Sequence, residues 1–253
     1  MKTQIDGIIL IISCNKHKDT RLKEFALEKK EYNNWKVIYV IGNLFLEEPY
    51  NLDDNFLYIK CEDSYIHLLK KLTLSIKYLY ELYDIKEGIL RCGDDLVFNE
   101  KYLIEFINNQ KYDYYGQSWN MCNFICTDKS LFKNTIYDPF MVDYYKLNPQ
   151  DFENPLHNLK DITIEKYMKR PKLYGAAGIV FYLSNKSCDI IIRHMKNIEF
   201  NIFHYDAFTD SYPYTIEDCG VSFIMYMNDI NFIHNPNFWD TKFAICKHTN
   251  KYK

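Results

Sequence analysis

Two adjacent carboxylates, Asp94 and Asp95, separate two apolar runs within residues 89–98. Burying both without partners inside a strand would cost several kcal/mol, so we expect the strand to end at a surface cleft just before them. Carboxylate oxygens at such a strand end can bind Mg²⁺ or Mn²⁺, often together with the oxygens of a substrate diphosphate. A plain acidic turn is the alternative interpretation of this pair taken alone.

The elements that must position this pair alternate between strands and helices. Apolar runs of strand length predict strands at residues 8–13, 35–42, 56–60 and 88–92. Amphipathic spacing predicts helices at residues 21–30, 63–83 and 99–109, with Asp63 and Ser64 capping the second. This alternation predicts a parallel, Rossmann-like sheet, in which ligands bind beyond the carboxyl ends of the strands. Asp94 and Asp95 fall at such an end.

The second half of the chain is less regular. Strands are predicted at residues 112–116 and 178–184, helices at 161–169, 185–196 and 217–228, and short strand-like runs at 230–234 and 242–246. Residues 124–155 read as a long, loop-rich stretch with three prolines. Since we find no linker and no internal repeat, we expect residues 1–253 to form one domain.

Composition limits the partners and the compartment. The net charge of -3 and the pI near 6.2 give no reason to expect nucleic-acid binding. No stretch approaches the roughly 20 apolar residues of a membrane span, so we expect a soluble protein. The 8 cysteines are scattered without a CxxC pair, which argues against a cysteine–zinc site and favours reduced thiols. A cytoplasmic location is therefore predicted, in the host cytoplasm if the source is a virus.

Several motifs, in order along nearly the whole chain, carry a family resemblance. They are Arg21 in the first predicted helix, residues 40–42 (VIG), 62–71 (EDSYIHLLKK), 91–99 (RCGDDLVFN), 175–184 (GAAGIVFYLS) and 216–219 (IEDC). Together these motifs resemble those of the β1,3-galactosyltransferase/Fringe family of inverting glycosyltransferases. The chain departs from that pattern at Gly93, where the family has the first Asp of an acidic triplet, and at His67, where it has Asn. The family's triple glycine is reduced to Gly178 preceded by alanines, and we expect no counterpart of the family's membrane anchor.

The resemblance implies an α/β protein with a glycosyltransferase-A (Rossmann-like) fold, whose mixed, mostly parallel central sheet is flanked by helices. Residues 1–110 would form the nucleotide-sugar-binding half, and residues 111–253 the acceptor-binding and catalytic half. The activity implied is a metal-dependent, inverting transfer of a hexosyl or N-acetylhexosaminyl group. The donor would be a nucleoside-diphosphate sugar, UDP-linked, and the acceptor a glycan or glycoprotein. A divergent, soluble member from a microbe or a large virus fits the departures.

The same resemblance assigns roles around the donor diphosphate. Asp95 would bind the Mn²⁺ or Mg²⁺ ion that holds the diphosphate, and Asp94 would support it. Arg21, Lys71 and Arg91 are the cationic residues expected near the donor, although solvated helix faces explain Arg21 and Lys71 equally well. His248 is our choice for a further metal ligand and His234 the second choice, with a surface position in the tail as the alternative.

Asp218 is the predicted general base. Inversion requires a carboxylate that removes the acceptor hydroxyl proton on the side opposite the leaving group. The alternative is that Glu217 and Asp218 only complement the dipole at the start of their helix. The remaining histidines, His17, His157, His194 and His204, are expected to be structural.

Two other functions compete with this interpretation. One is a catalytically silent protein that binds a glycan or nucleotide sugar on the same fold, which the missing Asp and glycines would explain. The other is a nucleotidyltransferase, but that chemistry usually needs a glycine-rich phosphate loop, and residues 13–20 contain no glycine. Retention of both Asp95 and Asp218 favours an active glycosyltransferase.

Overall fold

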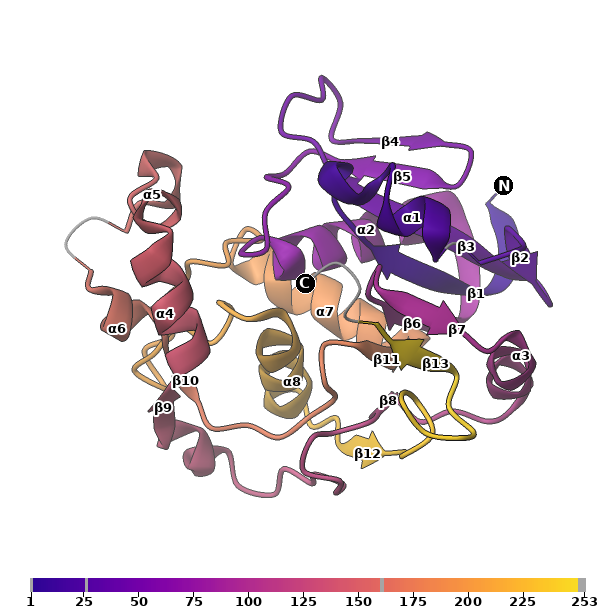
Figure 1. The fold of residues 1–253 in the computed structure, drawn as a ribbon. Helices are drawn as coiled ribbons and strands as arrows, with labels where there is room; N and C mark the ends of the chain where they lie inside the picture. Colours follow the sequence, from indigo (N-terminus) through magenta and orange to yellow (C-terminus); the bar gives the residue numbers. More distant parts are fainter. Residues whose placement is uncertain (1, 26, 160–161, 250–253) are drawn as a thin grey trace.

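A computed structural model describes residues 2–25, 27–159 and 162–249 of the chain. Within these residues a mixed, nine-stranded sheet crosses the molecule and is flanked by helices (Figure 1). Its main path runs β12 (Phe232–His234), β8 (Tyr114–Gly116), β11 (Val180–Ser184), β6 (Tyr83–Cys92), β1 (Thr3–Ile12), β3 (Trp35–Gly42), β5 (Phe56–Ile59) and β4 (Tyr50–Asp53), with β2 (Glu31–Tyr32) beside β3. The middle strands β6, β1, β3 and β5 are parallel, whereas β11 is antiparallel to both β6 and β8.

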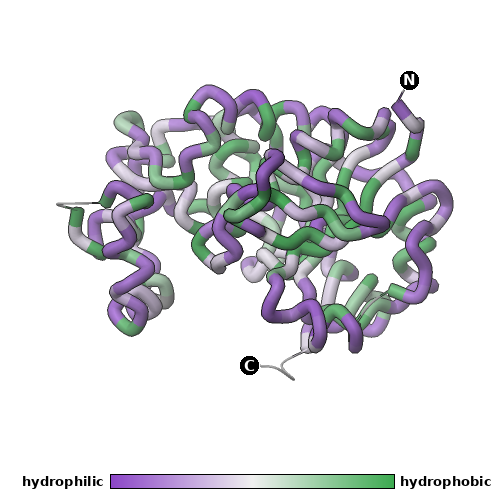
Figure 2. The backbone as a smooth tube through the Cα atoms, turned by 90° about the horizontal axis from the view of Figure 1, so that it is seen from above, coloured by the Kyte–Doolittle hydropathy of each residue, from purple (hydrophilic) through white to green (hydrophobic). Residues whose placement is uncertain are grey.

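The central strands are apolar on both faces because helices cover both. Along β1, Ile8 and Leu10 belong to one hydrophobic core, and Ile9 and Ile11 belong to the other, as the twofold alternation of a strand requires. Helices α2 (Leu68–Leu82), α7 (Asn185–Asn197) and α8 (Glu217–Met227) cover the first face. Helices α1 (Arg21–Glu24) and α3 (Glu100–Asn108), with the C-terminal segment, cover the second. Figure 2 shows hydrophobic stretches passing through the middle of the molecule, with further hydrophobic residues in the outer segments.

Smaller elements complete the fold. A 3-10 turn η1 (Asn15–His17) follows β1, and β7 (Leu96–Phe98) pairs with β13 (Cys246–His248). Another pair, β9 (Thr135–Tyr137) with β10 (Lys169–Pro171), joins a group of short helices at one end of the molecule (Figure 1). This group comprises η2 (Lys129–Lys133), α4 (Pro139–Leu147), α5 (Pro149–Phe152), η3 (Pro155–His157) and α6 (Ile164–Tyr167).

The predicted class, α/β with a mixed sheet and flanking helices, is confirmed, but several elements differ from expectation. Helix α2 begins at Leu68 and not at residue 63, and of the predicted run at residues 242–246 only Cys246 lies in a strand. The first helix ends at Glu24 instead of continuing to residue 30, and residue 26 lies outside the described residues. Strand β6 begins at Tyr83, directly after α2, because a bulge opposite β1 carries the strand through residues 86–87. Residues 161–169 contain only the short helix α6, with residue 161 itself outside the described residues.

The expectation of a loop-rich stretch at residues 124–155 missed helix α4. Asp138 caps this helix by accepting a hydrogen bond from the amide of Met141, and Pro139 occupies its first turn. An Asp followed by Pro is a helix-start signal in its own right, since both residues suit the first turn. No described helix is long and apolar enough to cross a bilayer.

Candidate functional site

A cavity of about 300 Å³ lies beyond the carboxyl ends of β1 and β6, where parallel sheets of this kind place their ligands. Its walls come from the loop after β1, the loop before α2, the turn after β6, residues 178–179, the start of α8, and the C-terminal strand. Every residue assigned to the site from the sequence lines this cavity: Arg21, Lys71, Arg91, Asp94, Asp95, Asp218 and His248.

Asp94 is held by side chains from the loop after β1 and from the start of α1. Its carboxylate accepts hydrogen bonds from Ser13 and His17, both at 2.6 Å, and from Arg21 at 2.9 Å. Burial alone would raise the pKa of Asp94, but these three hydrogen bonds together lower it below the usual value. Asp94 therefore anchors the first loop to the end of β6, and its oxygens are already engaged by the protein.

Asp95 and His248 meet because β13 pairs with β7. Strand β7 begins directly after Asp95, and the antiparallel register sets His248 opposite Leu96. Nε2 of His248 lies 3.2 Å from Oδ2 of Asp95, with Nη1 of Arg21 3.7 Å from the same oxygen. Neighbouring ligands of an octahedral ion with 2.1 Å bonds lie roughly 3.0 Å apart, so the two atoms fit adjacent positions around Mg²⁺ or Mn²⁺.

His234, the second choice for this role, lies elsewhere. It belongs to β12, and its Nδ1 accepts a hydrogen bond from the amide of Ser118 at 3.1 Å. It is not among the residues that line the cavity in the described structure. Of the two histidines, only His248 is brought to Asp95.

Lys71 is buried and joins three segments. Its Nζ donates to the carbonyl of Ser13 at 2.7 Å and to Oδ1 of Asp63 at 2.6 Å. The Asp63 carboxylate also accepts hydrogen bonds from the backbone amides of Asn15 and Gly42. Asp63 therefore ties the ends of β1 and β3 to α2, and the expectation that it caps this helix is wrong, since the N-cap position belongs to His67.

Arg91 forms a buried ion pair with Glu217. Its Nε lies 2.8 Å from Oε1 of Glu217, its Nη2 contacts the second carboxylate oxygen, and its Nη1 donates to the carbonyl of Gly178. Burial raises the pKa of Glu217, and the adjacent Arg91 guanidinium opposes that shift. The pair fixes the first turn of α8 against the end of β6, and with it the backbone of Asp218.

Asp218 is held by backbone amides. Oδ2 accepts from the amide of Gly178 at 3.0 Å, and Oδ1 accepts from the amide of Cys219 at 2.8 Å. A Cβ at position 178 would lie 3.3 Å from Oδ2, closer than such contacts normally come. The glycine therefore lets the carboxylate sit directly against the backbone.

A second cavity, of about 330 Å³, adjoins the first. Tyr65, Ile216 and Asp218 line both. The second cavity is otherwise walled by exposed Trp119, by Tyr174, and by the hydrogen-bonded pair of Asp138 and Arg170. Aromatic side chains beside polar groups suit the binding of a sugar, whose faces are apolar and whose edges carry hydroxyls.

The ion pairs of the first cavity show which carboxylates remain available for chemistry. Asp63, Asp94 and Glu217 are engaged by Lys71, Arg21 and Arg91, respectively. Asp95 contacts His248 and, at a longer distance, Arg21. Asp218 accepts hydrogen bonds from the backbone amides of Gly178 and Cys219, with the thiol of Cys219 also in contact, and no cationic side chain forms an ion pair with it among the described residues. Asp95 and Asp218 are thus the two carboxylates best placed to meet a ligand.

Sequence reasoning missed several residues of the cavity. His17 was expected to be structural, yet it contacts Asp94 and lines the cavity beside Ser13. Their position in the sequence could have identified both residues. They directly follow the first strand, β1, whose carboxyl end lies beside that of β6.

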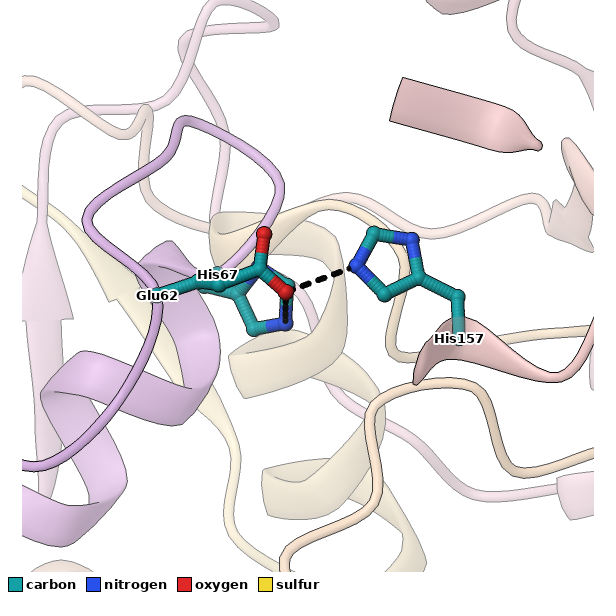
Figure 3. Close-up of side chains that lie close together, drawn as sticks. All are labelled: Glu62, His67 and His157. Atoms are coloured by element: carbon teal, nitrogen blue, oxygen red, sulfur yellow. Dashed lines mark hydrogen bonds and ion pairs between the residues drawn. The ribbon is translucent and has the colours of Figure 1, made fainter. Parts of the chain in front are cut away.

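His157 was likewise expected to be structural. It lies with Glu62 and His67 in a group that could bind a metal ion (Figure 3). This group was not predicted, because its members are up to 95 residues apart in sequence.

Comparison with known proteins adds no family to these observations. No protein-family model matches the chain, and no curated protein matches its sequence.

Proposed function

We propose that the protein is a metal-dependent, inverting glycosyltransferase with a glycosyltransferase-A fold. The first cavity would bind a nucleoside-diphosphate sugar, UDP-linked, and the second would bind a glycan acceptor. One observation carries the proposal: Asp218, the predicted base, lines both cavities. A carboxylate at the boundary of two pockets can reach a hydroxyl in one while a sugar in the other is attacked.

The reaction follows from this placement. The acceptor hydroxyl gives its proton to Asp218 as its oxygen attacks the anomeric carbon, and the bond from that carbon to the diphosphate oxygen breaks. Attack from the face opposite the diphosphate inverts the anomeric configuration. The amides of Gly178 and Cys219 orient the carboxylate for this step, and the Arg91–Glu217 pair holds the helix that carries it.

Asp95 and His248 are the residues that would hold Mn²⁺ or Mg²⁺, and Arg21 lies beside them. Such an ion, when bound, neutralises the charge that develops on the leaving diphosphate. In the proposed mechanism Asp94 has a positioning role. It holds the first loop in place and thereby positions Arg21.

A catalytically silent binding protein is the second candidate. One observation favours it: the oxygens of Asp94 are used by Ser13, His17 and Arg21, and Gly93 supplies no side chain, so Asp95 is the one carboxylate of this turn left for a metal. Such a protein would bind a nucleotide sugar without releasing the nucleotide.

Metal-linked nucleotide binding tests the donor site. UDP at a hundredfold excess over Kd should stabilise the protein by about 2.7 kcal/mol, or about 5–10 °C in Tm, with Mn²⁺ present. The gain should be much smaller with EDTA. Asp95→Ala should abolish the Mn²⁺-dependent part, and His248→Gln should reduce it.

His234→Gln is the matched control and should leave the gain unchanged, since His234 lies outside the cavity. An undiminished, Mn²⁺-dependent UDP shift in Asp95→Ala would remove Asp95 from the metal site. A shift lost in His234→Gln but kept in His248→Gln would exchange the roles of the two histidines.

A further inference from the structure

Glu62, His67 and His157 form a second group of ligand-type side chains. Glu62 and His67 flank residues 63–65, which line the first cavity, the proposed donor cavity. Glu62 lies in the loop after β5, His67 directly precedes α2, and His157 ends η3. In Figure 3, Glu62 and His67 lie together on one side, and His157 faces them from the other. One ligand atom from each residue lies within 4.8 Å of the others. Both histidines are 4% exposed, whereas the side chain of Glu62 is partly exposed, at 24%.

The ring nitrogens of His157 both face oxygen acceptors. Nδ1 lies 2.9 Å from the carbonyl oxygen of Asp151, which can only accept, so this nitrogen carries a proton. Nε2 lies 2.9 Å from Oε2 of Glu62, a carboxylate oxygen. With the proton on Nδ1, either a second ring proton or a metal ion bound by both atoms can join Nε2 to Oε2 of Glu62.

His67 presents a second nitrogen to the same oxygen. Its Nδ1 lies 2.9 Å from Oγ of Ser64, and its Nε2 lies 3.6 Å from Oε2 of Glu62. Both rings therefore turn Nε2 toward Glu62 while Nδ1 is held by another protein atom, the arrangement that orients metal-bound histidines.

We propose that Glu62, His67 and His157 bind a divalent transition-metal ion of the zinc type through one carboxylate oxygen and two Nε2 atoms. With metal–ligand distances of about 2.0–2.1 Å, neighbouring ligand atoms of a tetrahedral site lie roughly 3.3 Å apart. The spacings from Oε2 of Glu62, 2.9 Å to His157 and 3.6 Å to His67, bracket that value. Two imidazoles in three ligands favour Zn²⁺ over Mg²⁺ or Ca²⁺, which prefer oxygen.

The ion would join two segments that are far apart in sequence. Residues 63–65, between the first two ligands, line the donor cavity, and His157 belongs to the group of short helices that contributes Asp138 and Met141 to the second cavity. The ring of Phe203 stacks on His157 at a centroid distance of 4.4 Å and covers one side of the group. Histidine ligands buried in this way are typical of a structural metal site. The ion would fix the position of the segments that line one cavity relative to those that line the other. Zinc binding here needs neither nucleotide nor Asp95, and it is independent of the proposed activity.

Zinc titration of chelator-treated protein, without nucleotide, tests this site. Zn²⁺ at a hundredfold excess over Kd should raise Tm by about 5–10 °C, and elemental analysis after dialysis should find one zinc ion per chain. Co²⁺ should produce the visible absorption of a tetrahedral N/O site. Glu62→Gln, which keeps the size of a partly exposed side chain, should weaken Zn²⁺ binding by at least about tenfold. His157→Gln should do the same, and if it does not fold, Glu62→Gln alone decides.

Three controls assign the ion to this group. His194→Gln changes a partly buried histidine outside the group, Cys122→Ser removes an exposed thiol, and Asp95→Ala disables the proposed donor site. All three should keep the full Zn²⁺ shift. No zinc-dependent shift in the wild type, or a full shift in Glu62→Gln, would overturn the proposal. A shift lost in Asp95→Ala would place the ion in the donor cavity and would equally overturn it.

Discussion

Asp218→Asn is expected to lower turnover by about 10²–10⁴-fold, because an amide cannot take the acceptor proton. UDP affinity should change little, since the donor diphosphate is proposed to lie at Asp95 and His248. The variant should also lose about 1 kcal/mol of stability, because the Asn side chain has one oxygen to serve the two amides that Asp218 now accepts from. UDP release under single-turnover conditions and calorimetric titration with UDP measure the two effects separately.

Asp189→Asn, on the exposed surface of α7, is the matched control and should retain full turnover. Normal turnover in Asp218→Asn combined with weaker UDP binding would contradict the role of this residue as base. In that case Glu217 would not replace it readily, because its carboxylate is already engaged by Arg91.

Glu217→Gln is expected to destabilise the protein by about 3–5 kcal/mol, because it leaves the Arg91 guanidinium buried without its counter-charge. Both side chains are nearly inaccessible to solvent, at 4% for Arg91 and 5% for Glu217, so water cannot replace the lost partner. Denaturant unfolding, with the midpoint and slope fitted separately, measures the loss.

The double variant Arg91→Met/Glu217→Leu separates the pair energy from the cost of an isolated charge. It should recover a large part of the loss, since an apolar pair of similar volume leaves no buried charge. Recovery should be incomplete, because Arg91 also donates to the carbonyls of Gly178 and Ile179. A loss below about 1 kcal/mol in Glu217→Gln would show that the pair behaves like a solvated surface ion pair.

Strands and helices whose apolar residues follow an unbroken pattern were predictable from the sequence. Trp35–Gly42 is the predicted strand residue for residue, because an unbroken apolar run of strand length has no competing interpretation. His248, chosen as a metal ligand, lies beside Asp95 because β13 (Cys246–His248) pairs with β7. The catalytic and metal-binding roles of these residues stay predictions.

The contacts between the side chains of the site could not be predicted from the sequence. His17 meets Asp94 only because β1 and β6 are neighbours in register, and Lys71 meets Asp63 only because α2 begins later than expected. Glu62 and His157 meet through a segment whose helix α4 was missed. Each of these contacts depends on how elements pack, which residue types and spacing do not specify.

Proton NMR of the first-formed product, with UDP-α-sugars and Mn²⁺, tests the central claim most directly. Water can replace the acceptor hydroxyl in the second cavity, so slow hydrolysis needs no knowledge of the natural acceptor. We predict release of UDP together with the β-anomer of the sugar, dependent on Mn²⁺ and lost in Asp218→Asn. Formation of the α-anomer would contradict inversion, and release of UMP would indicate nucleotidyl transfer. Saturable binding of UDP-sugars with no release of UDP would identify a silent binding protein and contradict the claim.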